Sequence, residues 1–253
     1  MFSKASMIIE KNPDAMAYAA ARIFINAAEA NIKDHGRFNV ALSGGSTPRR
    51  MHVLLSEKPF GPAVQWKKIH IFWGDERCVP LDDPASNCGA ARNDFLDRVP
   101  IPEANIHPMS ADMDPAAAAL FYQKALEKHL PRDADGFPVF DLIFLGIGID
   151  GHIASLFPED AALDETERWV VAARGGAPDV MRLTLTFPVL NRAKQIAFMI
   201  SGKKKAKLVR TLFEEEGLLF PAQRIQPIRG KLLWILDAEA ASRLTSVLSH
   251  DAF

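Results

Sequence analysis

The sequence predicts an α/β fold: one domain with a mostly parallel sheet and helices packed on both of its faces. Short apolar runs alternate along the chain with helical patterns, which is typical of strand–helix–strand units with right-handed crossovers. The chain has 253 residues, of which 48% are hydrophobic and 24% charged. That length and composition fit a folded domain with its own core, and they exclude disordered, collagen-like and coiled-coil proteins.

Capping and turn signals define the elements up to residue 145. Asn12 as N-cap and Pro13 at the first helical position predict the first helix. Thr47 as N-cap with Pro48 after it predicts a helix behind the first strand, and Ser86 caps another. The ranges predicted here are helices 13–33, 86–96 and 115–130 and strands 38–42, 69–73 and 140–145.

The alternation continues to the C-terminus. Four further apolar runs are typical of buried strands, and helical patterns follow the third and the fourth of them. The ranges predicted here are strands 169–173, 183–187, 196–200 and 232–236, a helix after Gly202 and a helix over 237–248.

The net charge and the lengths of the apolar runs argue against nucleic-acid and membrane partners. Thirty Lys and Arg residues face 31 Asp and Glu residues, for a formal net charge of −1, so the basic excess of a nucleic-acid-binding protein is missing. No apolar run is long enough to span a membrane, so we expect no membrane partner. Glu10 and Lys11 stand where a signal peptide needs an apolar core, and we therefore expect a cytoplasmic protein whose Cys78 and Cys88 are reduced thiols.

Two strand ends carry groups suited to binding phosphate. Gly44, Gly45, Ser46 and Thr47 follow the strand 38–42 and open a helix, so backbone N–H groups and hydroxyls can cradle an anion there. The segment is not a Walker A loop, because no Gly-Lys-Ser/Thr follows at the required spacing. The alternative is an ordinary strand-to-helix turn.

Lysines at the helix start after Gly202 place positive charge where it opposes the helix dipole, a cost that a phosphate would offset. The alternative is a solvated basic patch.

Charged residues follow the strand 69–73. Arg77 can clamp a phosphate, a carboxylate or a developing oxyanion. Asp75 and Glu76 can orient Arg77 or bind sugar hydroxyls, whereas a solvated charged loop is the simpler reading. Arg182, which opens the run 182–186, is another candidate cation.

A glycine-rich turn with a histidine follows the strand 140–145. Gly146, Gly148 and Gly151 have the spacing of a dinucleotide-binding fingerprint, but Pro158 interrupts the sustained helix that the fingerprint needs. His152 is the better candidate, because a histidine is the natural general base near neutral pH and Asp150 can fix its tautomer. The alternative is a structural loop histidine. The other six histidines lack comparable settings, and no HExxH or Cys/His spacing indicates zinc.

Taken together, these motifs resemble the 6-phosphogluconolactonase family. The matching segments, in chain order, are 42–48 (LSGGSTP), 73–80 (WGDERCVP) with Ser86-Asn87, 146–158 (GIGIDGHIASLFP), 182–184 (RLT), Gly202 with Lys205, and 234–237 (WILD). They cover nearly the whole chain in order.

The resemblance implies a Rossmann-like single domain that hydrolyses 6-phospho-D-glucono-1,5-lactone to 6-phospho-D-gluconate, in the pentose phosphate pathway. It implies a small-molecule phosphosugar lactone as partner, no required metal or organic cofactor, and His152 as the base. We expect Asp150, Asp75 and Arg77 to complete the catalytic set, Arg182 and Lys205 to join the phosphate cradle, and the protein to be a monomer or a weak homo-oligomer.

One residue departs from the lactonase pattern and resembles a related family of deaminases. Ile153 stands where lactonases usually have threonine, and His-Ile-Ala resembles the glucosamine-6-phosphate deaminases. That resemblance also implies a glutamate five residues after the histidine, where this chain has Phe157, which transfers no protons. A sugar-phosphate sensor is a third reading, but the residues before the first predicted strand read as one helix and not as a helix-turn-helix.

Overall fold

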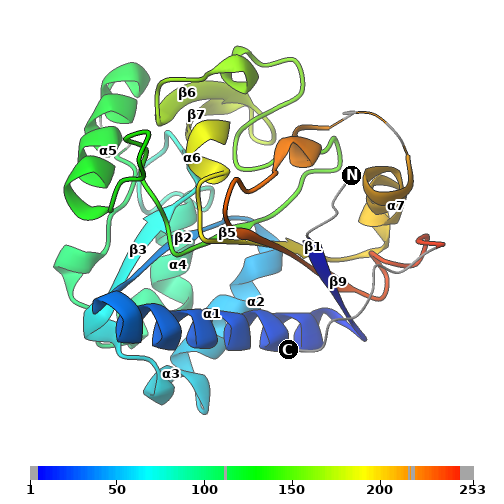
Figure 1. Ribbon diagram of the computed structural model, residues 1–253, viewed down its shortest axis with the longest axis horizontal. Coiled ribbons are helices and arrows are strands. Elements are labelled where there is room, and N and C mark those ends of the chain that lie inside the picture. The colour runs from blue at the N-terminus through cyan, green and yellow to red at the C-terminus, as the bar shows by residue number, and fades with distance from the viewer. Residues whose placement is uncertain (1–4, 111–112, 216, 218–219, 246–253) are drawn as a thin grey trace.

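The centre of the protein is a parallel sheet of six strands (Figure 1). The computed structural model describes residues 5–110, 113–215, 217 and 220–245. The strand order is β1-β9-β8-β5-β2-β3, and every neighbouring pair is parallel. The strands are β1 Ala5–Glu10, β2 Phe38–Leu42, β3 Ile69–Trp73, β5 Leu142–Leu145, β8 Gln195–Ile200 and β9 Lys231–Asp237. The mostly parallel sheet that the alternation predicts is confirmed.

A second, smaller sheet is antiparallel and was not predicted. It has the order β4-β7-β6, with β4 Asp75–Arg77, β6 Val170–Gly175 and β7 Val180–Leu185. β4 leaves the end of β3 after one glycine, and its Asp75 pairs with Thr184 of β7. The charged segment after β3 is therefore a strand, and the two sheets meet beside it.

Helices cover both faces of the parallel sheet, as predicted. In Figure 1, α1 runs below the sheet with α2 and α3 nearby, while α5 and α6 lie above it. The helices are α1 Pro13–His35, α2 Ser46–Ser56, α3 Phe60–Ala63, α4 Asn87–Asp94, α5 Pro115–His129, α6 Phe187–Leu190 and α7 Ala206–Glu214. Short 3₁₀ turns lie at Trp66–Lys68, Leu96–Arg98, Glu103–Asn105, Ala161–Asp164, Lys203–Lys205 and Pro221–Arg224.

The core has one cluster on each face of the sheet, and the alternation of side chains along each strand supplies both. In β2, Phe38, Val40 and Leu42 pack with α1, α2 and α4, whereas Ala41 faces the cluster that contains α5 and α7. Residues of a strand point to opposite faces in turn. A strand buried on both faces is therefore apolar throughout, as β2 nearly is.

Two helix predictions are wrong in detail. α2 begins at Ser46, with Gly45 as its N-cap at φ 86°, so Thr47 is not the cap. A glycine tolerates that left-handed φ at no steric cost. The helix predicted over 237–248 is absent among the described residues, where 238–243 form turns. The Asp237 carboxylate accepts hydrogen bonds from the N–H groups of Ala240 and Gly202, which holds the chain in a turn. Residues 246–248 lie outside the described part.

Among the described residues, none of the helices combines the length and apolar character that a membrane span requires.

Candidate active site

The parallel sheet has a switch point between β2 and β5. From β2 the chain moves outward to β3, and it then returns to place β5 on the other side of β2. Open α/β sheets bind ligands beyond the carboxyl ends of the strands at such a point. The two loops that leave it are tied together, because the Gly146 N–H donates to Ser43 Oγ at 3.2 Å.

A cavity of about 270 Å³ opens at this point. Nine of the ten residues predicted for the site line it, and the tenth, Asp150, stands behind His152. The lining residues are Ser43, Gly44, Gly45, Ser46, Thr47, Pro48, Asp75, Arg77, Asn87, Gly146, Ile147, Gly148, His152, Ala154, Arg182, Ser201 and Lys205. The fold thus gathers segments that are more than 150 residues apart in the sequence.

His152 is oriented by Asp150. The two side chains meet at 2.6 Å between His152 Nδ1 and Asp150 Oδ1, and the loop closes on itself through the Gly148 N–H and the His152 carbonyl at 2.8 Å. Burial opposes ionisation of Asp150, but the charge and hydrogen bonds of His152 prevail and lower the pKa of that carboxyl. With Nδ1 engaged by a carboxylate, Nε2 is the nitrogen left for chemistry.

Gly148 is required by this loop. A Cβ at position 148 would lie 2.1 Å from His152 Nδ1 and 2.4 Å from Asp150 Oδ1. Those distances are far inside van der Waals contact, so any larger residue would break the pair. The glycine spacing of the turn therefore makes room for the histidine and its carboxylate, and is not a dinucleotide fingerprint.

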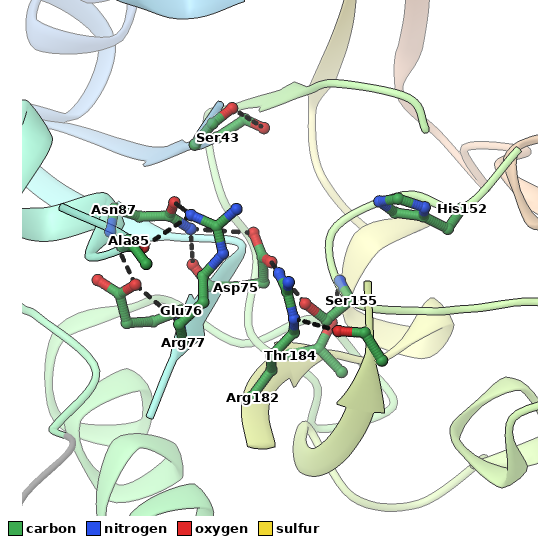
Figure 2. Close-up of polar contacts among 12 residues, drawn as sticks. Ser43, Asp75, Glu76, Arg77, Ala85, Asn87, His152, Ser155, Arg182 and Thr184 are labelled. Carbon is green, nitrogen blue, oxygen red and sulfur yellow. Dashed lines mark hydrogen bonds and ion pairs between the residues drawn. The ribbon is translucent and has the colours of Figure 1, made fainter. Parts of the chain in front are cut away.

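Asp75 and Arg182 form a buried polar group at the floor of the cavity (Figure 2). Ser155 Oγ donates to Asp75 Oδ2 at 2.6 Å, and Arg182 Nη1 lies 4.0 Å from the same oxygen. The Arg182 guanidinium also donates to the carbonyls of Gly175 and Pro178. Burial, and then the neighbouring charge of Arg77, lower the pKa of Arg182, while Asp75 opposes the shift.

Arg77 is held by Asn87 and Glu76. Arg77 Nη1 donates to Asn87 Oδ1 at 2.6 Å and to the Ala85 carbonyl at 2.8 Å. The buried Glu76 carboxylate accepts the backbone N–H groups of Arg77, Asn87 and Cys88, each at 2.8 Å. Burial raises the pKa of Glu76, although these N–H groups oppose the rise. Glu76 therefore fixes the backbone on which Arg77 and Asn87 stand.

The predicted phosphate cradle lines the same cavity, and its Gly44 lies against Asn87, since a Cβ at position 44 would be 1.8 Å from Asn87 Oδ1. The first turn of α2 offers backbone N–H groups from Ser46, which is exposed, and Thr47, which is half-buried, and such groups favour an anion. Lys205, at the start of α7, donates from Nζ to the Ile147 carbonyl. Burial lowers the pKa of Lys205, and the charge of Asp150 opposes that shift. The cradle and the lysine come from separate strand ends.

Sequence reasoning missed three polar residues of the site. Ser43, Asn87 and Ser155 lie within segments that match the family, but the sequence indicates no role for them. Ser155 and Ser43 are recognised as site residues only by their hydrogen-bond partners, which lie 80 and 103 residues away in the sequence. No local pattern carries such information.

Ile153 and Phe157, the two positions used above to compare lactonases with deaminases, have different surroundings. Ile153 is fully buried in the core cluster beside α5 and not in the cavity lining. The Phe157 ring packs 4.6 Å from the His152 ring and lies under the Arg182 guanidinium at 5.6 Å. Ile153 thus affects packing behind the histidine, whereas Phe157 presents an apolar surface to it.

Comparison with known proteins agrees with this arrangement. A model of the family described as glucosamine-6-phosphate isomerases/6-phosphogluconolactonase matches residues 11–234. The chain is 44% identical over 217 residues to the 6-phosphogluconolactonase of Synechocystis sp.. The aligned region covers 84% of this chain and 87% of that protein. The solved 6-phosphogluconolactonase from Leishmania guyanensis is similar, with a TM-score of 0.85 and 29% identity over 96% of this chain and 99% of that one.

A second branch shares the fold. A monomeric glucosamine-6-phosphate deaminase matches with a TM-score of 0.77 at 23% identity, over 94% of this chain and 99% of that one; this likeness concerns the fold alone. Because the family match spans most of the sequence and relatives remain similar over nearly their full length, the chain belongs to the family of glucosamine-6-phosphate isomerases and 6-phosphogluconolactonases.

Proposed function

We propose that the protein hydrolyses 6-phospho-D-glucono-1,5-lactone to 6-phospho-D-gluconate, the second step in the oxidative branch of the pentose phosphate pathway. The observation that carries the proposal is a histidine held by a carboxylate at Nδ1, in a cavity that also holds an anion cradle. The proposal is supported by relatives that are named 6-phosphogluconolactonase and are similar to this chain over most of their length.

The phosphate anchors the substrate. Gly44, Gly45, Ser46 and Thr47 offer backbone N–H groups and hydroxyls, while Lys205 and Arg182, which also line the cavity, supply positive charge. Holding the remote phosphate fixes the lactone carbonyl against His152, which converts an encounter with water into an oriented reaction. The cavity volume of about 270 Å³ suits a single phosphosugar.

His152 then acts as general base. Its Nε2 takes a proton from a water molecule as the water oxygen bonds to C1 of the lactone, and the carbonyl electrons move onto the oxygen to give a tetrahedral oxyanion. Arg77 or backbone N–H groups stabilise that oxyanion. The bond between C1 and the ring oxygen breaks, and the imidazolium returns its proton to the departing oxygen. Asp150 stabilises the imidazolium throughout.

The direct test is hydrolysis of the lactone by the purified full-length chain. We expect 6-phosphogluconate to form well above the spontaneous rate, and chelator to leave that rate unchanged. The lactone is generated in place, and a no-enzyme control measures its unaided opening. Absence of acceleration would contradict the proposal. Ammonia release from glucosamine-6-phosphate would then assign the deaminase reaction, and inactivity with both substrates would point to a sugar-phosphate sensor.

Replacing Lys205 with alanine tests the phosphate cradle. We expect KM for the lactone to rise about 10-fold with kcat nearly unchanged, because a contact to the non-reacting phosphate is made equally in the ground and transition states. Steady-state kinetics measure the split. Lys204→Ala is the matched control, since Lys204 is exposed and outside the cavity lining. Equal effects of the two substitutions would contradict the assignment.

Replacing Gly148 with alanine tests the histidine–carboxylate pair. The added methyl would displace His152 or Asp150, and we expect kcat to fall about 10²-fold, as displacements near 1 Å do in active sites. Gly74→Ala is the control, because a Cβ there meets the Leu42 carbonyl at an ordinary 3.7 Å. Full activity of the Gly148 variant would show that the pair is not needed.

A further inference from the structure

Three histidines meet on the α5 side of the sheet, away from the active site. His70 lies in β3, His107 follows the turn at Glu103–Asn105, and His129 is the last residue of α5. One ring nitrogen of each lies within 4.8 Å of the others. Their spacings of 37 and 22 residues match no metal-binding motif, so the sequence showed no sign of this cluster.

The geometry is close to that of a three-imidazole metal site. His70 Nδ1 and His107 Nε2 are 3.1 Å apart, and the centroids of His107 and His129 are 4.2 Å apart. Nitrogen ligands around tetrahedral zinc, with bonds near 2.0–2.1 Å, lie about 3.4 Å from one another. Small rotations of the rings would therefore bring all three nitrogens to one ion.

The rings are held in place by regular structure. The His107 N–H donates to the Ile71 carbonyl at 2.9 Å, and the His107 ring stacks on Phe72 with centroids 4.4 Å apart. His107 is 8% exposed, whereas His70 and His129 are half-buried and leave a path from solvent. Burial lowers the pKa of each ring, that of His107 to about 3, so the imidazoles are neutral and keep a lone pair for a ligand bond.

Two features oppose a cation. Arg37 and Lys128 are near enough for their charges to act on the cluster. In addition, His70 and His107 satisfy each other by a hydrogen bond when no ion is bound. The cluster contains no carboxylate, which makes it a poor site for Mg²⁺ or Ca²⁺ but a good one for transition metals that prefer imidazole.

We propose that His70, His107 and His129 bind one divalent transition-metal ion of the zinc type, which fastens the edge strand β3 to the end of α5. The site is structural. His70 is three residues before the end of β3, so it lies about 10 Å short of the strand end where the cavity opens. The proposal is independent of the lactonase reaction, which needs no metal in the mechanism above.

Titration of the tag-free, chelator-stripped protein with ZnCl₂, followed by calorimetry, tests the proposal. We expect a saturable site of one ion per chain and a rise in Tm when the site is filled, because a ligand that binds the folded state stabilises it. His70→Gln and His129→Gln, both at half-buried positions, are each expected to weaken zinc binding at least ~100-fold. This loss exceeds the usual effect of removing a residue that only hydrogen-bonds to a metal ligand.

Two control variants test whether zinc binds at histidines outside the cluster. His35→Gln removes a part-exposed histidine outside the cluster, and His152→Ala removes the histidine of the active site. Both are expected to keep the zinc affinity and the rise in Tm. Absence of saturable binding at one ion per chain would overturn the proposal. Binding that persists in both glutamine variants, or that is lost in His152→Ala, would overturn it as well.

Discussion

Replacing His152 with alanine is expected to lower kcat for hydrolysis of the lactone by about 10²–10⁴-fold, the usual contribution of a positioned general base. In the proposed mechanism the imidazole holds the proton that passes from the attacking water to the departing ring oxygen, and its Nδ1 is engaged by Asp150. KM is expected to change little, because the phosphate is bound by other strand ends. Steady-state kinetics above the spontaneous background measure both constants.

Controls separate the base from the fold. The His152 side chain is 27% exposed and stands on a loop, so its loss leaves the core intact, which circular dichroism and a denaturation curve check. Asp150→Asn keeps a hydrogen-bonding group but removes the charge that stabilises the imidazolium, and an intermediate loss of kcat is expected. Turnover near the normal value in a folded His152→Ala protein would eliminate the general-base role.

Replacing Arg182 with methionine is expected to lower the free energy of unfolding by about 3 kcal/mol. The side chains of Arg182 and Asp75 are 4% and 8% exposed, and removing one member of a buried ion pair leaves the other charge without compensation. Ser155, which donates to Asp75 at 2.6 Å, retains part of that compensation, so the loss falls at the low end of the range for such pairs. Urea denaturation measures it.

Two further variants make this result specific. The double variant Arg182→Met with Asp75→Asn removes both charges, and we expect it to recover part of the lost stability in a double-mutant cycle. Arg174→Met breaks an exposed pair with Asp179 at 3.3 Å, and no measurable change is expected because solvent screens such pairs. A small effect at Arg182, equal to that at Arg174, would contradict the account of the buried pair.

The sequence predicted the buried parallel strands best. Phe38–Leu42 and Ile69–Trp73 are observed at their predicted bounds, because strands covered on both faces are apolar throughout and stand out from their surroundings. β1 lies at the edge of the sheet and is mostly half-buried, so its pattern is weak. β4 consists of Asp, Glu and Arg, whose stability as a strand depends on β7, more than 100 residues away.

Candidate site residues could be proposed from the sequence where a motif is local. The phosphate cradle and the pair formed by Asp150 and His152 each lie within one loop, and the structure brings them to one cavity. Ser155 and the cluster of three histidines depend on contacts between distant segments. Their neighbours are fixed by the strand order and by the course of the second sheet, which side-chain periodicity does not encode.

The turn formed by residues 146–152 after β5 holds both members of the histidine–carboxylate pair, which separates this pair in the sequence from the predicted anion cradle. Its turns are closed by the bonds between Gly148 and His152 and between Gly151 and Gly148. It contacts the predicted anion cradle through the bond from Gly146 to Ser43 and through the bond from Lys205 to the Ile147 carbonyl. A substitution inside this turn is therefore expected to change the geometry of the reactive pair while the first turn of α2 keeps its structure.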